Sequence, residues 1–350
     1  MHVKVHGHDS GASEEKRFVL RTSLAARPAA RIEPSNLSPI ILIREFLTMD
    51  ALQKLLFTRA NVRGETVRLG DELGKALAEQ NLPLAARRFA GELASAALLS
   101  AGAIQLDGTV ALQIEGDGPI RRALAEVRAD FSFRVMIQMR EGAPEPDANA
   151  DLRTLVNASG RGRCALILDR ANRPADEAPY QGVVALEGAT FAEALENYFE
   201  RSEQVETKLA LASDGESAGG ILLQKLPAEG GRLPEDYDPE GWTRVRMFGD
   251  TVKSIELLTL APEEINRRLF WEESPLVTLE AAPKFACSCS GARFDEIIRG
   301  LGEPEAEAIV AERGAIDIRC PFCGRAKRYD GVDVKALFAN AAHAPQAAKA

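Results

Sequence analysis

Histidine is scarce in this chain, and its scarcity limits the chemistry that the protein can perform. Of the 350 residues only four are histidine, and only His343 lies beyond the first eight positions. Histidine is the side chain that most often transfers protons in catalysis near neutral pH. No Ser/His/Asp group and no paired-carboxylate motif takes its place, so we expect a protein that is not an enzyme.

The sequence also lacks a long apolar run and an excess of basic residues. The most apolar early stretch, residues 39–57, is interrupted by four charged side chains and does not predict a membrane span. The first 12 residues are polar and contain no apolar core of the signal-peptide kind. The formal net charge of −9 disfavours a nucleic-acid-binding surface. We therefore expect a cytoplasmic protein without membrane or nucleic-acid partners.

Cysteine is rare as well, but four of the five cysteines are grouped near the end of the chain. Cys287 and Cys289 form one pair, and Cys320 and Cys323 form a second within Cys-Pro-Phe-Cys-Gly, with 30 residues between the pairs. Two short chelating loops with four thiolates are what a tetrahedral zinc ion requires. A Cys-x-Cys pair can chelate a metal, and its two sulfurs are also close enough to oxidise to each other.

Other interpretations of these four cysteines fit less well, with one exception. Four buried cysteines without a ligand would be unusual, and disulfide frameworks are typical of short secreted domains. A purely structural zinc site, as in ribbon modules, remains open. Cations near the cysteines would stabilise a negatively charged zinc–thiolate cluster. They would also favour the thiolate form, which oxidants attack. The spacing of these residues is equally compatible with ordinary surface charges. These cations are Lys284, Arg293, Arg319, Arg325, Lys327 and Arg328.

The fifth cysteine, Cys164, has different surroundings. It opens the apolar run Cys-Ala-Leu-Ile-Leu, with no charge among these residues. A free cysteine in such a run behaves as a small apolar side chain. We expect Cys164 to lie in the core and to take no part in redox chemistry.

Composition divides the chain into five parts. Residues 1–38 mix Gly, Ser, Ala and Pro with both charges and predict a flexible extension. Residues 39–228 mix predicted helices and strands without regular βαβ alternation, which predicts an α+β core domain. Residues 229–284 hold 12 Asp or Glu against seven Lys or Arg and predict a helical connector of low intrinsic stability. A small zinc-binding domain follows at residues 285–340, and a disordered tail at residues 341–350.

Hydrophobic patterns predict individual elements within these parts. Residues 39–60 predict a helix, and residues 103–115 predict a hairpin with its turn at Asp107-Gly108. The connector predicts two amphipathic helices, at residues 247–258 and 262–272. The remaining predictions are helices at 71–80, 83–101 and 191–202, strands at 62–69, 131–140, 164–169, 180–185, 207–212 and 220–226, and a helix or strand at 121–129.

A set of short motifs follows in a fixed order along the chain. They are Gly116-Asp-Gly-Pro119, Tyr180-Gln-Gly-Val-Val184, Tyr198-Phe-Glu-Arg-Ser-Glu-Gln204, Gly219-Gly-Ile-Leu-Leu-Gln224 with Leu226-Pro227, Glu256-Leu-Leu-Thr-Leu260, and the two cysteine pairs. Together they resemble the heat-shock protein 33 family, the bacterial redox-regulated holdase chaperones. The resemblance covers roughly residues 55–340, and nothing carries over to the segments outside it.

This resemblance implies a function and a site. The reduced protein would be an inactive monomer with one zinc ion per chain on Cys287, Cys289, Cys320 and Cys323. Oxidation would form the Cys287–Cys289 and Cys320–Cys323 disulfides, release zinc, and unfold the C-terminal domain and then the redox-sensitive linker. The resulting homodimer would bind unfolding clients without ATP and later pass them to ATP-dependent foldases. The alternative is a constitutive binding module with a purely structural zinc site.

Overall fold

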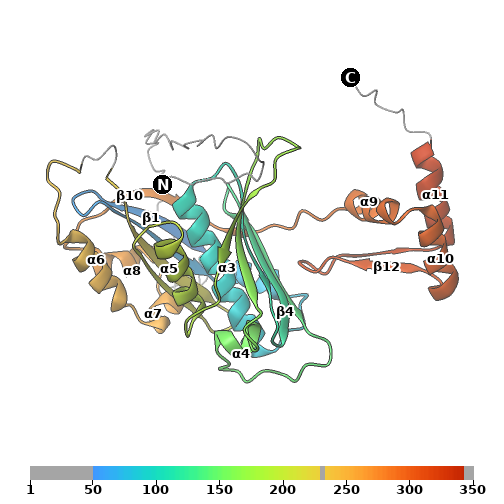
Figure 1. The fold of residues 1–350 in the computed structure, drawn as a ribbon, viewed down its shortest axis with the longest axis horizontal. Coiled ribbons are helices and arrows are strands. Elements are labelled where there is room, and N and C mark those ends of the chain that lie inside the picture. The colour runs from blue at the N-terminus through green and yellow to red at the C-terminus, as the bar shows by residue number, and fades with distance from the viewer. Residues whose placement is uncertain (1–49, 229–232, 343–350) are drawn as a thin grey trace, which may run out of the picture. The chain divides into compact units, whose positions relative to one another are not determined.

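The computed structural model describes residues 50–228 and 233–342, which form two compact units (Figure 1). The first unit extends to Phe285 without Ala78–Gln80, and the second comprises Ala78–Gln80 and the chain from Ala286. The predicted extension at 1–38, three of the four histidines within it, and most of the predicted tail lie outside the described residues. Helices and antiparallel strands mix without βαβ alternation, so the predicted α+β class is confirmed.

Helix α3 (Leu84–Ile104) is the centre of the first unit. It is buried on almost every side, because it packs against strands of two different sheets. A helix that is apolar all round is expected in such a position. Its many alanines, together with Gly91 and Gly102, have small side chains or none, so both sheets can approach the helix closely. No helix among the described residues is long and apolar enough to cross a membrane.

One side of α3 faces a six-stranded sheet with the order β11-β5-β4-β3-β6-β7. All neighbours in it are antiparallel except β11 and β5. Cys164 lies on β6 with 2% of its surface exposed, and burial raises the pKa of its thiol to about 12. The prediction that Cys164 lies in the core is confirmed. The strands are β3 (Gly108–Glu115), β4 (Ile120–Arg128), β5 (Ser132–Met139), β6 (Arg163–Arg170), β7 (Tyr180–Val184) and β11 (Lys284–Phe285).

The other side of α3 faces a five-stranded antiparallel sheet with the order β10-β1-β2-β9-β8. Successive residues of a strand point to opposite faces. On β1, Leu52 therefore belongs to the core around α3, whereas Leu55 and Phe57 point to the opposite face. The strands are β1 (Ala51–Phe57), β2 (Val62–Leu69), β8 (Thr207–Ser213), β9 (Ala218–Lys225) and β10 (Leu276–Ala281). Helices α2 (Asp71–Leu77), α4 (Leu152–Val156) and α5 (Phe191–Arg201) complete this part of the unit.

Three short helices of the connector cover that opposite face. They are α6 (Gly241–Asp250), α7 (Ser254–Thr259) and α8 (Pro262–Phe270). Trp242, Val245 and Phe270 enter an apolar cluster with Leu55 and Phe57, and the rings of Phe57 and Phe270 meet edge to face at 5.0 Å. The central strands of the five-stranded sheet are thus covered on both faces.

Polar contacts accompany this apolar interface. Asn266 of α8 accepts a hydrogen bond from the Thr66 hydroxyl at 2.6 Å and donates one to the Gln53 side chain at 2.7 Å. Gln53 in turn donates to Glu280 of β10 at 3.0 Å. Thr66, Gln53 and Glu280 stand opposite one another on three adjacent strands, so one polar row connects α8 with both β1 and β10.

The second unit is small. It consists of α9 (Gly291–Leu301), α10 (Glu303–Arg313), β12 (Ile316–Arg319), β13 (Ala326–Tyr329) and α11 (Gly331–Ala342), with β12 and β13 paired antiparallel. Few of its side chains are fully buried, among them Phe294, Ile298 and Tyr329. Folds with so little core usually need a disulfide or a metal.

The predicted helix at residues 39–60 is wrong for its described part, because Ala51–Phe57 is strand β1. Both faces of this strand are covered, so its residues are buried almost without alternation. A strand of that kind cannot be distinguished from a buried helix by periodicity alone.

The predicted hairpin at residues 103–115 is also wrong. Helix α3 continues through Ile104 and ends at Gln105, which has a positive φ of 53° and donates its N–H to the Ala101 carbonyl at 3.1 Å. Asp107-Gly108 therefore connects a helix to β3. A Cβ atom at Gly108 would lie 2.1 Å from the Asp169 carbonyl oxygen on β6, so glycine is required by a close approach to another strand.

The prediction for the connector missed two features. The single helix predicted at residues 247–258 is broken into α6 and α7, and the Lys253 N–H at the start of α7 donates to the Glu256 carboxylate at 3.0 Å. The connector also contains strand β10, which joins the edge of the five-stranded sheet. The position of β10 depends on pairing with β1, a distant part of the sequence.

Charged side chains are buried where α3 ends. Lys54 and Arg63 donate hydrogen bonds to the carbonyls of Gly102 and Ala103, at 2.7 and 2.6 Å, and so satisfy the last turn of the helix. Glu65 is completely buried beside them, and neither of its carboxylate oxygens has a hydrogen-bond partner within the described structure. Burial raises the pKa of Glu65 to about 7, although Arg63 and Lys54 oppose the shift.

We predict that Glu65→Gln will flatten the pH dependence of stability. The pKa of Glu65 is about 7 in the folded chain, against an ordinary value of 4.5, so the folded state retains a proton that the unfolded state has released. The stability that this proton supplies is full at low pH and is lost as pH rises through the folded pKa, by up to about 3 kcal/mol. Urea unfolding at about pH 5 and about pH 8 should show a larger loss for the wild type than for the variant. Parallel profiles would contradict the prediction.

Candidate metal centre

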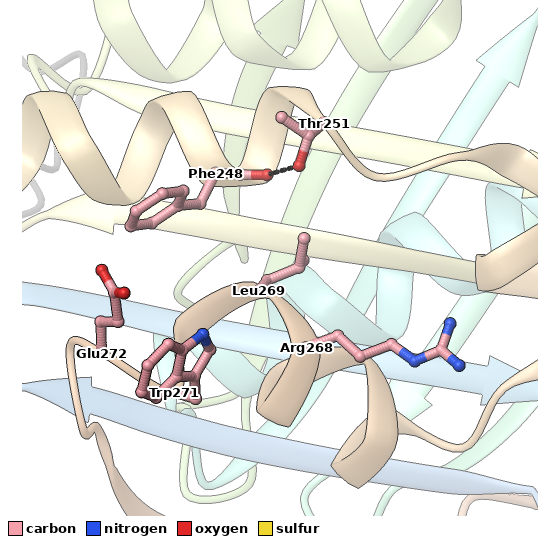
Figure 2. A pocket seen from close by; sticks show the side chains of 6 residues that line it. All are labelled: Phe248, Thr251, Arg268, Leu269, Trp271 and Glu272. Carbon is pink, nitrogen blue, oxygen red and sulfur yellow. Dashed lines mark hydrogen bonds between the residues drawn. The ribbon is translucent and has the colours of Figure 1, made fainter.

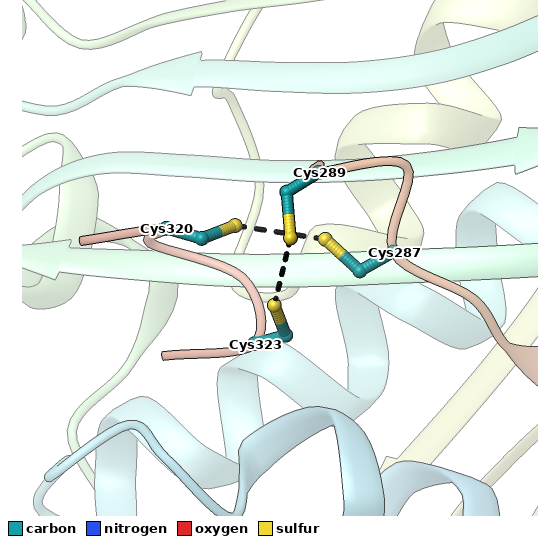
Figure 3. A group of neighbouring side chains, drawn as sticks. All are labelled: Cys287, Cys289, Cys320 and Cys323. Atoms are coloured by element: carbon teal, nitrogen blue, oxygen red, sulfur yellow. Dashed lines mark hydrogen bonds between the residues drawn. The ribbon is translucent and has the colours of Figure 1, made fainter. Parts of the chain in front are cut away.

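The four predicted cysteines come together in the second unit (Figure 3). Their Sγ atoms all lie within 4.8 Å of one another. Two close contacts run between the pairs, 3.5 Å from Cys287 to Cys320 and 3.2 Å from Cys289 to Cys323. Cys320 is buried, and the other three cysteines are half-buried.

The first pair lies in the loop before α9. Cys287 and Cys289 precede Ser290, whose side chain caps α9 by accepting the Arg293 N–H at 3.2 Å. A serine at this position satisfies one of the free N–H groups of the first turn. The Arg293 guanidinium also donates to the Ser288 hydroxyl at 2.8 Å. The helix start therefore fixes the path of the loop that carries both sulfurs.

The second pair lies in the turn between β12 and β13. The Cys320 N–H donates to the Arg325 carbonyl at 2.8 Å, and the Gly324 N–H donates to the Cys320 carbonyl at 3.0 Å. Gly324 has a φ of +68°, a left-handed conformation that favours glycine. This tight turn brings Cys320 and Cys323 toward one point.

Two contacts connect the parts of the chain that carry the pairs. Arg325, beside the second pair, donates to the Cys289 carbonyl at 3.0 Å. Farther from the sulfurs, Asp295 of α9 accepts hydrogen bonds from Lys327 and Tyr329 of β13, both at 2.6 Å. Because these links do not involve the sulfurs, they contribute to the fold of the unit independently of a metal.

The donor set fits a divalent metal ion. Zn–S bonds of ~2.3 Å in a tetrahedral site place the sulfurs about 3.8 Å apart, and the cluster has this size. Desolvation first, and hydrogen bonds with the neighbouring thiols second, raise the pKa of Cys289. A bound cation reverses this effect and holds the thiols deprotonated. The four cysteines are therefore capable of binding a metal.

A second surface feature lies on the connector, where a shallow pocket opens between α6 and α8 (Figure 2). Trp271 beside it has 68% of its surface exposed. By contrast, Leu257 and Phe270 are buried against the five-stranded sheet. The pocket is lined by Phe248, Thr251, Arg268, Leu269, Trp271 and Glu272.

Sequence reasoning identified the sulfurs but not the residues that position them. The sequence marks Arg325 only as a nearby cation and does not predict the hydrogen bonds of Asp295. The short spacing within each cysteine pair can be recognised from the sequence alone. The partners of Asp295 lie more than 30 positions away, and no sequence motif marks such a pairing.

We predict that Asp295→Ala will weaken metal binding without touching a sulfur. The Tyr329 hydroxyl, on a side chain that is 2% exposed, would lose its acceptor. An unsatisfied buried group costs about 1–3 kcal/mol, and folding and metal binding are coupled in small metal domains. Competition with a chromogenic chelator should show the apparent Kd for zinc rising roughly tenfold.

Asp317→Ala is the matched control for this change. Asp317 lies 3.8 Å from Arg328, and both side chains are 70% exposed. Exposed ion pairs contribute little, so the control should bind zinc as the wild type does. Equal affinities in the two variants would show that Asp295 does not support the site.

Comparison with known proteins connects this geometry to a family. The chain matches the family described as Hsp33 protein over residues 50–330. It is 36% identical over 291 residues to the 33 kDa chaperonin of Methylobacillus flagellatus, a match that covers 83% of this chain and 94% of that protein. The 33 kDa chaperonin of Chromobacterium violaceum is 37% identical over 289 residues, with the same two coverages.

A solved structure has the same fold. The crystal structure of a 33 kDa chaperonin from Thermotoga maritima superimposes with a TM-score of 0.68 at 22% identity, and the match covers 84% of this chain and 99% of that chain. The resemblance inferred from the motifs is thus confirmed. This chain belongs to the Hsp33 family of redox-regulated chaperones, which are not enzymes.

Proposed function

We propose that this protein is an ATP-independent holdase that one zinc ion keeps inactive in the reduced state. The observation that carries the proposal is the convergence of four cysteine sulfurs within 4.8 Å in a unit with little apolar core. Cys287, Cys289, Cys320 and Cys323 would hold the ion as thiolates. Structural zinc supplies ~10–16 kcal/mol of apparent folding free energy in small metal domains, which is comparable with the ~5–15 kcal/mol stability of a whole domain.

Oxidation would remove this support. Two thiolates give two electrons to one molecule of peroxide, an S–S bond forms, and the O–O bond breaks with uptake of two protons to leave two water molecules. Two such reactions consume the four thiolates and two peroxide molecules. Disulfide sulfurs carry no negative charge, so they no longer hold Zn²⁺, which is released to solvent.

The proposed pairing is Cys287 with Cys289 and Cys320 with Cys323. Each of these disulfides closes a loop of only one or two intervening residues. Neither would connect the chain before α9 to the turn between β12 and β13. A four-point cross-link would thus become two local ones, and the second unit would lose its long-range connection.

The connector would then lose its fold. Its helices α6, α7 and α8 are shorter than the ~12–15 residues at which an isolated helix becomes marginally stable. They depend on the five-stranded sheet, and their departure would uncover Leu55 and Phe57 together with their own buried side chains Leu257 and Phe270. Unfolded proteins bind to such apolar surface.

We extend the proposal to the organisation and partners of the protein. The core domain would span residues 39–228, the redox-sensitive linker residues 229–284, and the zinc-binding domain residues 285–340. The protein would be cytoplasmic, monomeric when reduced and homodimeric when oxidised. Unfolded clients would be passed to ATP-dependent foldases.

Our first prediction here is a stoichiometry of about one zinc ion per reduced chain. Elemental analysis should show this value for the wild type and a large loss for Cys323→Ser, which removes one ligand. Cys164→Ser should keep its zinc, because Cys164 is buried in β6. Retention in Cys323→Ser together with loss in Cys164→Ser would refute the ligand assignment.

The second prediction is that zinc release and chaperone activity rise together during peroxide treatment. A metallochromic dye would report free zinc while light scattering reports the aggregation of a heat-denatured client. The reduced protein should suppress aggregation several-fold less than the oxidised protein, because its apolar surface is covered. Equal suppression before and after zinc release would favour a constitutive binding module with structural zinc.

A further inference from the structure

We propose that the edge of β1 is a docking site for an extended segment of an unfolded client, and that β10 occupies this edge until oxidation releases it. The inference rests on the proposed holdase function. It adds a location and a mode of binding, namely backbone pairing at one named strand. Five observations on the five-stranded sheet support it.

The first observation is that β10 is poorly anchored. It is the edge strand of the sheet, next to β1, as Figure 1 shows. Five of its six residues are exposed, with 56% of Leu276 and 52% of Val277 accessible to solvent. Its pairing with β1 shifts register between Lys54 and Leu55. A strand with so little buried apolar surface opens at low free-energy cost.

Second, only a few side chains hold β10 in place. Gln53 donates to the Glu280 carboxylate at 3.0 Å, and the Thr278 hydroxyl donates weakly to the Lys54 carbonyl at 3.4 Å. Glu280 and Thr278 are both exposed, so water competes for these bonds. The ladder of backbone hydrogen bonds therefore supplies most of the attachment.

In contrast, β1 is firmly held. It pairs with β2 along its whole length, from Ala51 opposite Arg68 to Phe57 opposite Val62. Leu52 is 1% exposed and belongs to the core around α3. If β10 leaves, β1 remains in the sheet and presents a free row of N–H and C=O groups, which is a template for pairing with another chain.

The fourth observation is the position of β10 at the end of the linker, between α8 and the second unit, both of which the proposed mechanism unfolds. Helix α8 ends five residues before it, and β11 and Ala286 follow it closely. The Asn266–Gln53–Glu280 contacts also join α8 to β10. Loss of α8 would remove part of this row, so β10 would leave more easily.

The last observation concerns the kind of partner that fits. Backbone hydrogen bonds do not depend on side-chain identity, so any extended polypeptide can pair with the edge of β1. Once the connector has left, Leu55 and Phe57 on β1 are uncovered beside the edge, and they favour a strand with apolar residues at alternate positions. The segment that now occupies the edge, Leu-Val-Thr-Leu-Glu-Ala, has this composition. Unfolded chains with apolar stretches match it.

Hydrogen exchange on the full-length protein tests the inference. Three states would be compared: reduced, oxidised, and oxidised with carboxymethylated lactalbumin as a permanently unfolded client. Amides of residues 51–57 should exchange faster after oxidation and about tenfold more slowly again with the client bound, because client backbone groups replace those of β10. Amides of residues 276–281 should remain unprotected with the client.

The outcomes separate this inference from the holdase proposal. Client binding without renewed protection of residues 51–57 would overturn strand replacement alone. Protection of residues 276–281 by the client would also overturn it, since the client would then be adding to the outer side of β10. Failure of the oxidised protein to bind the client would overturn the holdase proposal, and this inference with it.

A peptide and two matched variants sharpen the test. A peptide of residues 274–283 should displace the client, whereas the same peptide with alternate backbone N-methyl groups should not, because it cannot complete the ladder. In the reduced protein, Glu280→Ala should speed exchange at residues 51–57 several-fold. Glu280→Gln keeps an acceptor for Gln53 and should behave as the wild type does. Identical exchange in Glu280→Ala and wild type would contradict a contribution of the Gln53–Glu280 contact to the attachment of β10.

Discussion

The five-stranded sheet must be covered on both faces, and the rest of the first unit is arranged to meet this constraint. Helix α3 covers one face and belongs to the central core. The other face depends on α6, α7 and α8, which are short and would be unstable alone. One cover thus belongs to the central core, whereas the other consists of short helices. In the mechanism that we propose, this asymmetry lets a folded chain keep a large apolar surface covered until the helices unfold.

The interface under the conditional cover is not purely apolar. Asn266 is 5% exposed and places a polar side chain between Thr66 and Gln53, among contacts that are otherwise hydrophobic. Burial of such a group is tolerated only while its partners are in place. The hydrogen bonds therefore specify one position of α8 on the sheet. They also weaken the interface relative to apolar packing, since water satisfies the same groups once the helix leaves.

The second unit uses its sulfur cluster where larger domains use a core. Four sulfurs on two loops meet at one point, supported by Arg325 and by the contacts of Asp295 with β13. In small metal domains, folding is coupled to metal binding, which requires deprotonated and unoxidised thiols. In the mechanism that we propose, the chemistry of four side chains controls the stability of more than fifty residues. A hydrophobic core of the same size would not respond to an oxidant.

The sequence by itself determined the cysteine site, the α+β class, the burial of Cys164 and the family, because short spacings and ordered motifs are local signals. It did not determine that Ala51–Phe57 is a strand or that α3 extends to Ile104, because these depend on packing against both faces of a sheet and on the contacts at the end of α3. It did not predict β10, whose strand partner in the described structure is β1, more than 200 residues earlier. Pairing between distant strands is decided by tertiary structure, since no local pattern records which edge a strand will join.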